Sequence, residues 1–186
     1  MIAVKRATYE DLLALPEHQV GQIIDGELIV QPRPAMPHAW ATSELGGVLI
    51  PAFRRGQGGP GGWVILAEPE LHLGPDPDVL VPDLAGWRRE RMPVMPETAY
   101  CTLAPDWICE VLSPSTAKVD RTKKPPVYAR ERVPHVWIVD PDAKTLEVFR
   151  LEGERYSLLS SFADEPRVRA EPFDAIELEL PALFAR

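Results

Sequence analysis

The sequence lacks asparagine altogether and has only four glutamines and two cysteines among its 186 residues. Cys101 and Cys109 are too few for a disulfide framework, so we expect reduced thiols. No run approaches the roughly 20 apolar residues that are needed to span a membrane. The N-terminus also lacks the apolar core of a secretory signal. We therefore expect a cytoplasmic protein that does not enter a membrane.

Basic residues are also outnumbered, because 28 acidic residues against 20 basic ones give a formal net charge of −8. Phosphate binding usually leaves a basic footprint, so this balance argues against a nucleic-acid substrate. It does so less strongly if positive charge is local, or if bound divalent cations offset clustered carboxylates. The 21 prolines and the few amides are typical of a thermophile, although a GC-rich genome gives the same bias.

The N-terminal part of the chain predicts a short helix, a hairpin and a longer helix. Thr8, with Asp11 three residues later, resembles a helix cap, and the helix is expected to end near Leu15. Asp25-Gly26 lies between apolar runs and is a strong hairpin signal. The apolar spacing from His38 to Arg55 predicts a helix whose end is weakened by glycines and a proline.

The remaining segments alternate between strands and one helix. Residues 63–73, 79–87, 106–113 and 135–141 each predict a strand, and residues 144–162 predict a C-terminal hairpin around Gly153. A helix through Tyr128 separates the last two of those strands. The length suits one buried core. We therefore expect a single α/β (α+β) domain over residues 1–186, with a mixed sheet flanked by helices.

Glu110 is the most informative residue for function. It interrupts an apolar strand and shares a face with Ile108 and Leu112. An unpaired carboxylate there costs several kcal/mol, or else remains protonated. We therefore expect a cation, a metal ion or strong hydrogen-bond donors beside it. The alternative is an edge-strand glutamate that faces water.

Other charged residues have a plainer interpretation when each is taken alone. Asp83 ends a buried run, where a strand-end turn is the favoured reading of that segment. Glu27 follows the hairpin turn and predicts a solvated position, and Asp76 and Asp78 predict turn residues. The one basic cluster either belongs to a site or forms a solvated helix start; it comprises Lys118, Arg121, Lys123 and Lys124.

Several other chemistries are disfavoured. Ser115 and Lys118 fit S-x-x-K, but the companion motifs of that enzyme class are absent. The glycine-rich loop 56–62 lacks the Lys-Ser/Thr of a phosphate-binding loop. The four histidines have no zinc-site spacing and predict structural or exposed positions; they are His18, His38, His72 and His135.

Taken together, the segments resemble the Uma-type putative restriction endonuclease family, long catalogued as a domain of unknown function, within the PD-(D/E)XK nuclease superfamily. The matching stretches follow the family's order and cover about three-quarters of the chain. They are IIDGELIV, the proline-rich link to His38, VPDL, CEVLSPST, DRTKK with Tyr128 beyond it, and VPHVWIVDP.

The resemblance implies a restriction-endonuclease-like core, with helices on both sides of a mixed sheet. It also implies a site for Mg²⁺ or Mn²⁺ with Asp83 and Glu110 as ligands, and Glu27 as a third acid.

The superfamily places a lysine two residues after the second acid, but here that position is Leu112. The resemblance implies that Lys124, rather than its neighbour Lys123, supplies the displaced lysine. Prolines are tolerated only in a first helical turn, so Pro125-Pro126 predicts a helix that starts late, near Thr122.

The function implied by the resemblance is Mg²⁺-dependent hydrolysis of DNA phosphodiester bonds. One alternative is a catalytically degenerate member that acts as a nucleic-acid-binding or regulatory module, which the acidic charge and the missing in-strand lysine favour. Another is a hydrolase of a different phosphorylated substrate, because a fold does not fix a function. We also expect a homodimer, from the resemblance and because exposed late strands need covering.

Overall fold

The protein is described from a computed structural model, which covers residues 6–16, 19–32 and 34–184. The strands are β1 (Gln19–Ile24), β2 (Glu27–Pro32), β3 (Trp63–Ala67), β4 (Glu70–Leu73), β5 (Asp78–Leu80), β6 (Leu84–Arg88), β7 (Tyr100–Cys101), β8 (Trp107–Val111), β9 (His135–Asp140), β10 (Thr145–Glu152), β11 (Arg155–Phe162), β12 (Arg167–Val168) and β13 (Leu178–Glu179). The helices are α1 (Tyr9–Leu13), α2 (Met36–Leu49), a π-helical turn (Ile50–Arg54), α3 (Ala117–Thr122), α4 (Lys124–Arg130) and a 3-10 helix (Leu180–Phe184). Among the described residues, none of these helices is long and apolar enough to cross a membrane.

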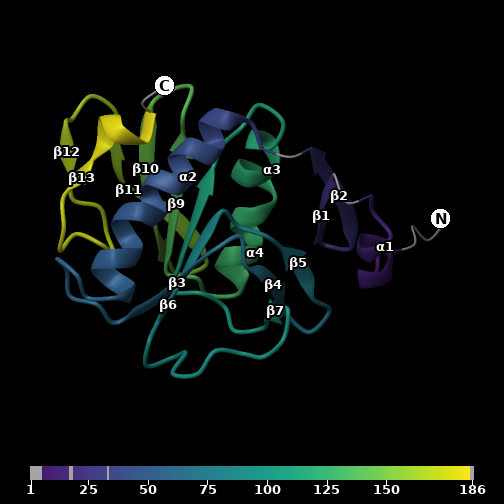
Figure 1. The fold of residues 1–186 in the computed structure, drawn as a ribbon. Coiled ribbons are helices and arrows are strands. Elements are labelled where there is room, and N and C mark those ends of the chain that lie inside the picture. The colour runs from purple at the N-terminus through teal and green to yellow at the C-terminus, as the bar shows by residue number, and fades with distance from the viewer. Residues whose placement is uncertain (1–5, 17–18, 33, 185–186) are drawn as a thin grey trace.

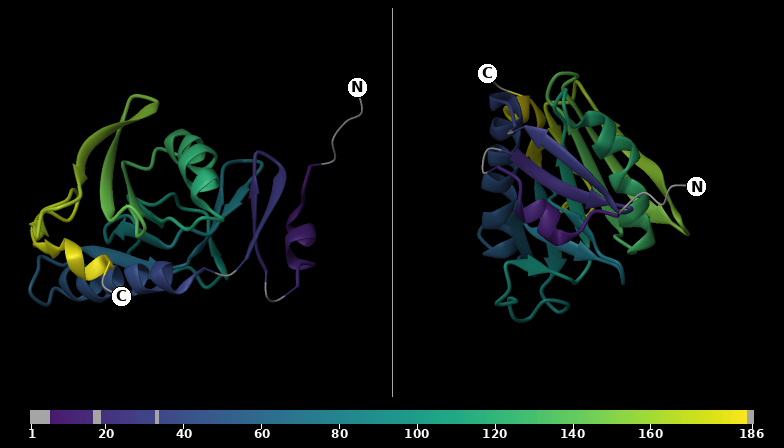
Figure 2. Two further views of the ribbon diagram at one scale, coloured as in Figure 1. Left: turned by 90° about the horizontal axis from the view of Figure 1, so that it is seen from above. Right: turned by 90° about the vertical axis from the view of Figure 1, so that its right-hand side faces the viewer.

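A six-stranded mixed sheet forms the centre of the molecule, in the order β11-β10-β9-β8-β6-β3. Only β8 and β9 are parallel within it, and α3 and α4 connect them. Helix α2 and the 3-10 helix cover one face, and α3 with α4 cover the other (Figures 1 and 2). The expected α/β architecture, with helices on both sides of a mixed sheet, is therefore confirmed.

Strand β8 contributes to both faces of this sheet. Trp107, Cys109 and Val111 belong to the core cluster under α2, whereas Ile108 belongs to the cluster under α4. Alternate residues of a strand point to opposite faces. Glu110 therefore faces α4, on the same side as Ile108.

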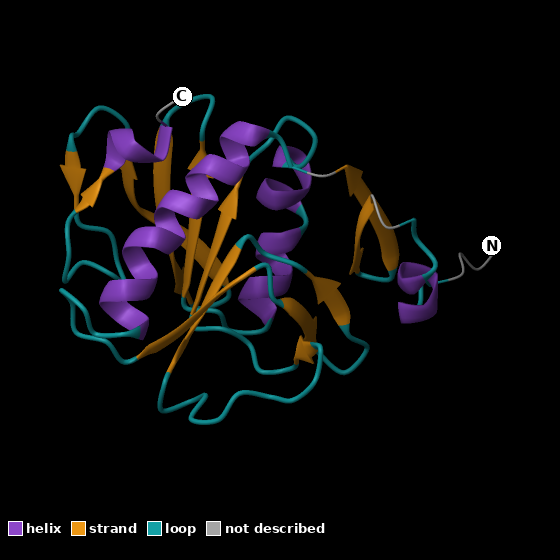
Figure 3. Cartoon of the chain, in the orientation of Figure 1, coloured by secondary structure: helices purple, strands orange, loops and turns teal. Residues whose placement is uncertain are grey.

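A smaller five-stranded sheet, in the order β2-β1-β5-β4-β7, extends to one side with α1 at its outer end (Figures 1 and 3). Thr8 caps α1 in a capping box with Asp11, as the sequence predicts. The hairpin turn at Asp25-Gly26 is also confirmed, because both residues have positive φ, 53° and 80°. These values suit the two-residue turn that matches the twist of a hairpin.

The C-terminal hairpin is confirmed too, since β10 pairs with β11 around Gly153. Its outer strand, β11, is one edge of the six-stranded sheet.

Two segments that predict single strands are each broken in the structure. Residues 63–73 form β3 and β4, and residues 79–87 form parts of β5 and all but the last residue of β6. β3 pairs with β6 in the large sheet, whereas β4 pairs with β5 in the small one. Pro69 and Pro82 lie at the two breaks, where a residue without an N–H cannot continue a ladder. Asp83 therefore lies at the junction of the two sheets.

The helix through Tyr128, expected to start near Thr122, is α4, which starts at Lys124, and a separate helix, α3, precedes it from Ala117 to Thr122. Pro125 and Pro126 occupy the first turn of the second helix, α4, where the missing N–H groups need no partner within the helix. The prolines therefore lie in the first turn, as the sequence predicts, and the preceding helix α3 is the element that was not expected.

Asp78 is a second correction, because the sequence predicts only a turn residue there. Its side chain is buried at the start of β5. It accepts a hydrogen bond of 2.6 Å from the backbone N–H of Asp25 and pairs with Arg130 of α4. This contact joins the small sheet to the helix beside the large one.

Candidate active site

Glu110 lies near the end of β8, between β6 and β9, and its side chain is only 1% exposed. Its Oε2 accepts a hydrogen bond from Lys124 Nζ at 2.8 Å, and its Oε1 accepts one from the Tyr128 hydroxyl at 2.5 Å. Burial raises the pKa of Glu110 to about 8, with Lys124 opposing the shift and the negative charges of Asp120 and Asp83 adding to it. The expected donors beside a buried glutamate are present.

Lys124 is the first residue of α4, and its side chain is 3% exposed. Its ammonium also lies 2.8 Å from Asp120 Oδ1, one helical turn earlier. Burial lowers the pKa of Lys124, but the charges of Glu110, Asp120 and Asp83 outweigh it and hold that pKa above its ordinary value. The lysine is therefore held in its charged form, between the carboxyl groups of Glu110 and Asp120.

Asp83 approaches the same place from the junction of the two sheets. Its Oδ2 accepts a hydrogen bond of 2.6 Å from the backbone N–H of Val111, the residue that follows Glu110. Its Oδ1 lies 2.9 Å from Nε2 of His38, a buried residue on α2. These two contacts fix both oxygens of the carboxylate.

A cavity of about 50 Å³ lies among these groups. The polar side chains in its wall that matter here are Gln31, His38, Asp83, Glu110, Asp120 and Lys124. Two of their buried atoms, Gln31 Nε2 and His38 Nδ1, have no hydrogen-bond partner among the described residues, and Asp120 Oδ1 has only its ion pair with Lys124. The acids Glu68, Asp83, Glu110 and Asp120 line the cavity with a single lysine, so acidic groups outnumber the lysine in its wall. Such a cavity suits a cation together with a polar ligand.

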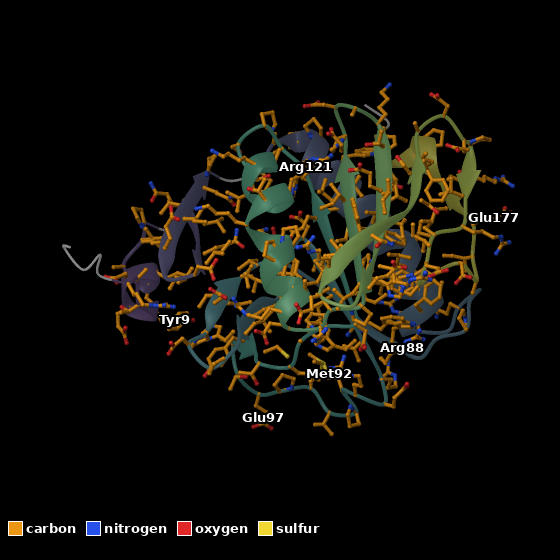
Figure 4. All side chains as sticks on the ribbon, turned by 180° about the vertical axis from the view of Figure 1, so that it is seen from behind. Tyr9, Arg88, Met92, Glu97, Arg121 and Glu177 are labelled. Carbon is orange, nitrogen blue, oxygen red and sulfur yellow. The ribbon has the colours of Figure 1, made fainter. Side chains whose placement is uncertain are left out.

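Of the residues assigned by resemblance, the structure brings Asp83, Glu110 and Lys124 together. It does not bring Glu27 to them, because that side chain is 65% exposed, pairs with Lys123 at 2.5 Å and is absent from the cavity wall. Lys123 faces outward, whereas Lys124 faces the cavity. Arg121 of the basic cluster, labelled in Figure 4, instead donates to Glu147 of β10 at 2.7 Å.

His38, Gln31 and Asp120 are among the residues of the cavity wall that were not anticipated from the sequence as parts of a site. His38 was grouped with the scattered histidines, and Gln31 carried no signal beyond the scarcity of amides. Asp120 could have been found, because it lies four residues before Lys124, the spacing of an ion pair on a helix.

The donor set fits Mg²⁺ or Mn²⁺ bound by a few protein oxygens. Within the described residues, no three histidine, cysteine, aspartate or glutamate side chains are arranged to hold a metal ion. A cage made entirely of protein ligands is therefore not formed. Mg²⁺ commonly keeps several waters and takes one or two carboxylates, and the carboxylates of Asp83 and Glu110 supply that number.

The fold and sequence are similar to known proteins over nearly their whole length. A crystal structure of a putative nuclease belonging to DUF820, from Anabaena variabilis, is 27% identical and superposes with a TM-score of 0.74. The similarity covers 96% of this chain and 97% of that one. Residues 7–182 match the Uma2 family, described as putative restriction endonuclease. No functionally curated protein matches the chain.

Proposed function

The chain belongs to the Uma2 family of putative restriction endonucleases, and on that premise we propose that it hydrolyses DNA phosphodiester bonds with the help of Mg²⁺ or Mn²⁺. The observation that carries this proposal is the buried contact of Lys124 with Glu110, in a cavity that Asp83 also lines. Two acids and a lysine are the side chains that a metal-assisted phosphodiesterase needs.

Asp83 and Glu110 would hold the metal ion. The ion, when bound, would polarise the phosphate and lower the pKa of a water molecule, so that hydroxide is available as the nucleophile. Val111 N–H and His38 keep the Asp83 carboxylate in one orientation. Glu110 must be ionised to bind the cation, so the proton that its raised pKa retains near neutral pH has to leave.

Lys124 would stabilise negative charge that develops on the phosphate. Its raised pKa makes it a poor base and a good electrostatic donor. Asp120 continues to hold the ammonium when Glu110 binds the metal. Leu112, at the position where the superfamily keeps its lysine, is buried and apolar. The displaced lysine on α4 reaches the site from the neighbouring element.

The net charge of −8 supports a second candidate, a nuclease-fold protein that binds or regulates without cleaving. Calorimetric titration with Mn²⁺, followed by a plasmid-nicking assay, distinguishes the two candidate functions. Metal binding with nicking that disappears in Lys124→Met but persists in Lys123→Met supports the endonuclease. A parent protein that neither binds Mn²⁺ nor nicks DNA supports the non-catalytic candidate.

We also propose that two copies associate through β11. This strand leaves one edge of the large sheet unpaired within the described part of the chain, and it exposes Leu158 and Leu159. Free edges and exposed leucines favour association with another chain. Sedimentation equilibrium of the parent and of Leu158→Lys tests this, because a dimer held by β11 should dissociate in the variant.

A further inference from the structure

Gln22 of β1 and Gln31 of β2 form a buried hydrogen-bonded pair, 2% and 8% exposed. The backbone N–H of Val81 donates to Gln22 Oε1 at 3.1 Å. A backbone N–H can only donate, so this contact fixes which end of the Gln22 amide is oxygen. Gln22 Nε2 then donates to Gln31 Oε1 at 3.2 Å. The chain of contacts leaves the Gln31 NH₂ group as its free end.

That free end is buried and has no acceptor among the described residues, and Gln31 lines the cavity with Asp83, Glu110 and Lys124. An unpaired buried donor costs free energy that a methionine of similar shape would avoid. The chain has only four glutamines and no asparagine, yet two of its amides are buried here. The Gln31 amide therefore has the features of a group kept for a ligand.

The chemistry of the NH₂ group limits what that ligand is. It can donate to an oxygen, but it cannot coordinate a cation. The carboxylates of the same wall suit a cation, so a ligand that also satisfies Gln31 must present a hydrogen-bond acceptor. A non-bridging oxygen of a phosphodiester does so while its charge is neutralised by the cation.

The cavity adjoins a wider hollow and is large enough for such a group. Its volume of about 50 Å³ exceeds the roughly 10–15 Å³ that one water needs. It shares Pro34, His38 and Glu68 with a more open hollow of about 370 Å³ on the α2 side. A substrate lying in the outer hollow can thus direct one group inward.

We propose that Gln31 Nε2 binds a non-bridging phosphate oxygen of the substrate, and that Gln22 and Val81 N–H aim it. The small sheet thereby supplies the phosphate-binding wall opposite the acids of the large sheet. This inference rests on the proposed endonuclease function, because it names the contact by which the same site holds its substrate.

Two variants distinguish the loss of the Gln31 NH₂ donor from the loss of the contact between Gln31 and Gln22. Gln31→Glu keeps an acceptor for Gln22 and removes the donor, whereas Gln31→Met removes both without adding charge. Both should retain Mn²⁺ binding and lose about ten- to hundredfold in kcat/KM for plasmid nicking, the scale of one hydrogen bond to a charged acceptor. Gln57→Met, in the exposed glycine-rich loop, is the matched control and should nick as the parent does.

The absence of asparagine provides a direct readout. The ¹H–¹⁵N spectrum should contain only four side-chain NH₂ pairs, one for each glutamine, and Gln31→Glu identifies its own by removing it. Addition of Ca²⁺ and thymidylyl-thymidine, which has a single phosphodiester, should shift the Gln31 pair and leave the Gln57 pair in place.

The outcomes distinguish the inference from the function on which it rests. Nicking by the parent and by both Gln31 variants within twofold of each other overturns the inference alone. So does binding of the dinucleotide that moves backbone signals but not the Gln31 pair. A parent that neither nicks DNA nor binds the dinucleotide overturns the proposed function, and the inference with it.

Discussion

Lys124 Nζ lies 2.8 Å from Glu110 Oε2, and both side chains are almost fully buried although they come from different elements. Lys124 also pairs with the buried Asp120, so removing the lysine leaves that buried carboxylate without compensation, which costs far more than the pair contributes. The contact therefore fixes α4 against β8, and it places a cation beside the acid that would hold the metal.

Lys124→Met is expected to lower nicking by about a hundredfold, because one positioned donor to a developing charge contributes on that scale. Mn²⁺ affinity should be retained, since a cation that competes for Glu110 is removed. The free energy of unfolding should fall by about 3–5 kcal/mol in denaturant titration. Lys123→Met, which removes only an exposed pair with Glu27, should leave nicking and stability near the parent's. Equal nicking by both variants would contradict the assignment.

Asp83→Ala and Asp83→Asn are both expected to abolish Mn²⁺ binding in calorimetric titration, because each removes a charged ligand. Their stabilities should differ. Relief of like-charge repulsion alone predicts no loss in either variant, but Asp83 also accepts the Val111 N–H. Alanine leaves that buried donor unpaired, at a cost of about 1–3 kcal/mol, whereas asparagine retains an acceptor. Asp76→Asn, at an exposed turn, is the control. Mn²⁺ binding by either Asp83 variant would sink the metal assignment.

Local signals in the sequence predicted the parts of the fold that depend on neighbouring residues. The Thr8 cap, the Asp25-Gly26 turn and the face of Glu110 follow from backbone conformation and strand alternation. The breaks at Pro69 and Pro82 were missed because an apolar run can pass between two sheets without losing its apolar character.

Only part of the candidate site could be predicted, because the sequence does not show which distant segments meet in the fold. The resemblance indicated Asp83, Glu110 and Lys124, which the structure brings together. Gln31 and His38 come from β2 and α2, far from these residues in sequence. Their polar atoms become part of one site only where the two sheets and α2 meet. Glu27 was indicated by position in a motif, and the register of β2 leaves it on the surface.

The thermal stability of the protein tests whether its many prolines and its lack of asparagine are those of a thermophile. The 21 prolines and the absence of asparagine lead us to expect a melting midpoint above about 80 °C in calorimetry, outside the mesophile cluster. Prolines restrict the unfolded chain, which raises stability where the native backbone accepts them. A midpoint of about 45–65 °C would instead indicate that a GC-rich genome explains the many prolines and the missing asparagine.

The last prediction concerns Glu110, whose pKa is raised from 4.5 to about 8, chiefly by burial. A raised pKa means that the folded protein holds the proton more tightly than the unfolded chain. The resulting stabilisation is complete below pH 4.5 and is lost as pH rises through about 8. In EDTA, the melting midpoint should therefore fall between about pH 6 and about pH 9. The melting midpoint of Glu110→Gln should fall less over this range, because glutamine does not titrate. Mn²⁺ should raise the melting midpoint of the parent again at the higher pH, because the cation favours the ionised carboxylate. A parent and variant with identical pH profiles would show that Glu110 is ionised throughout, with Lys124 as its permanent partner.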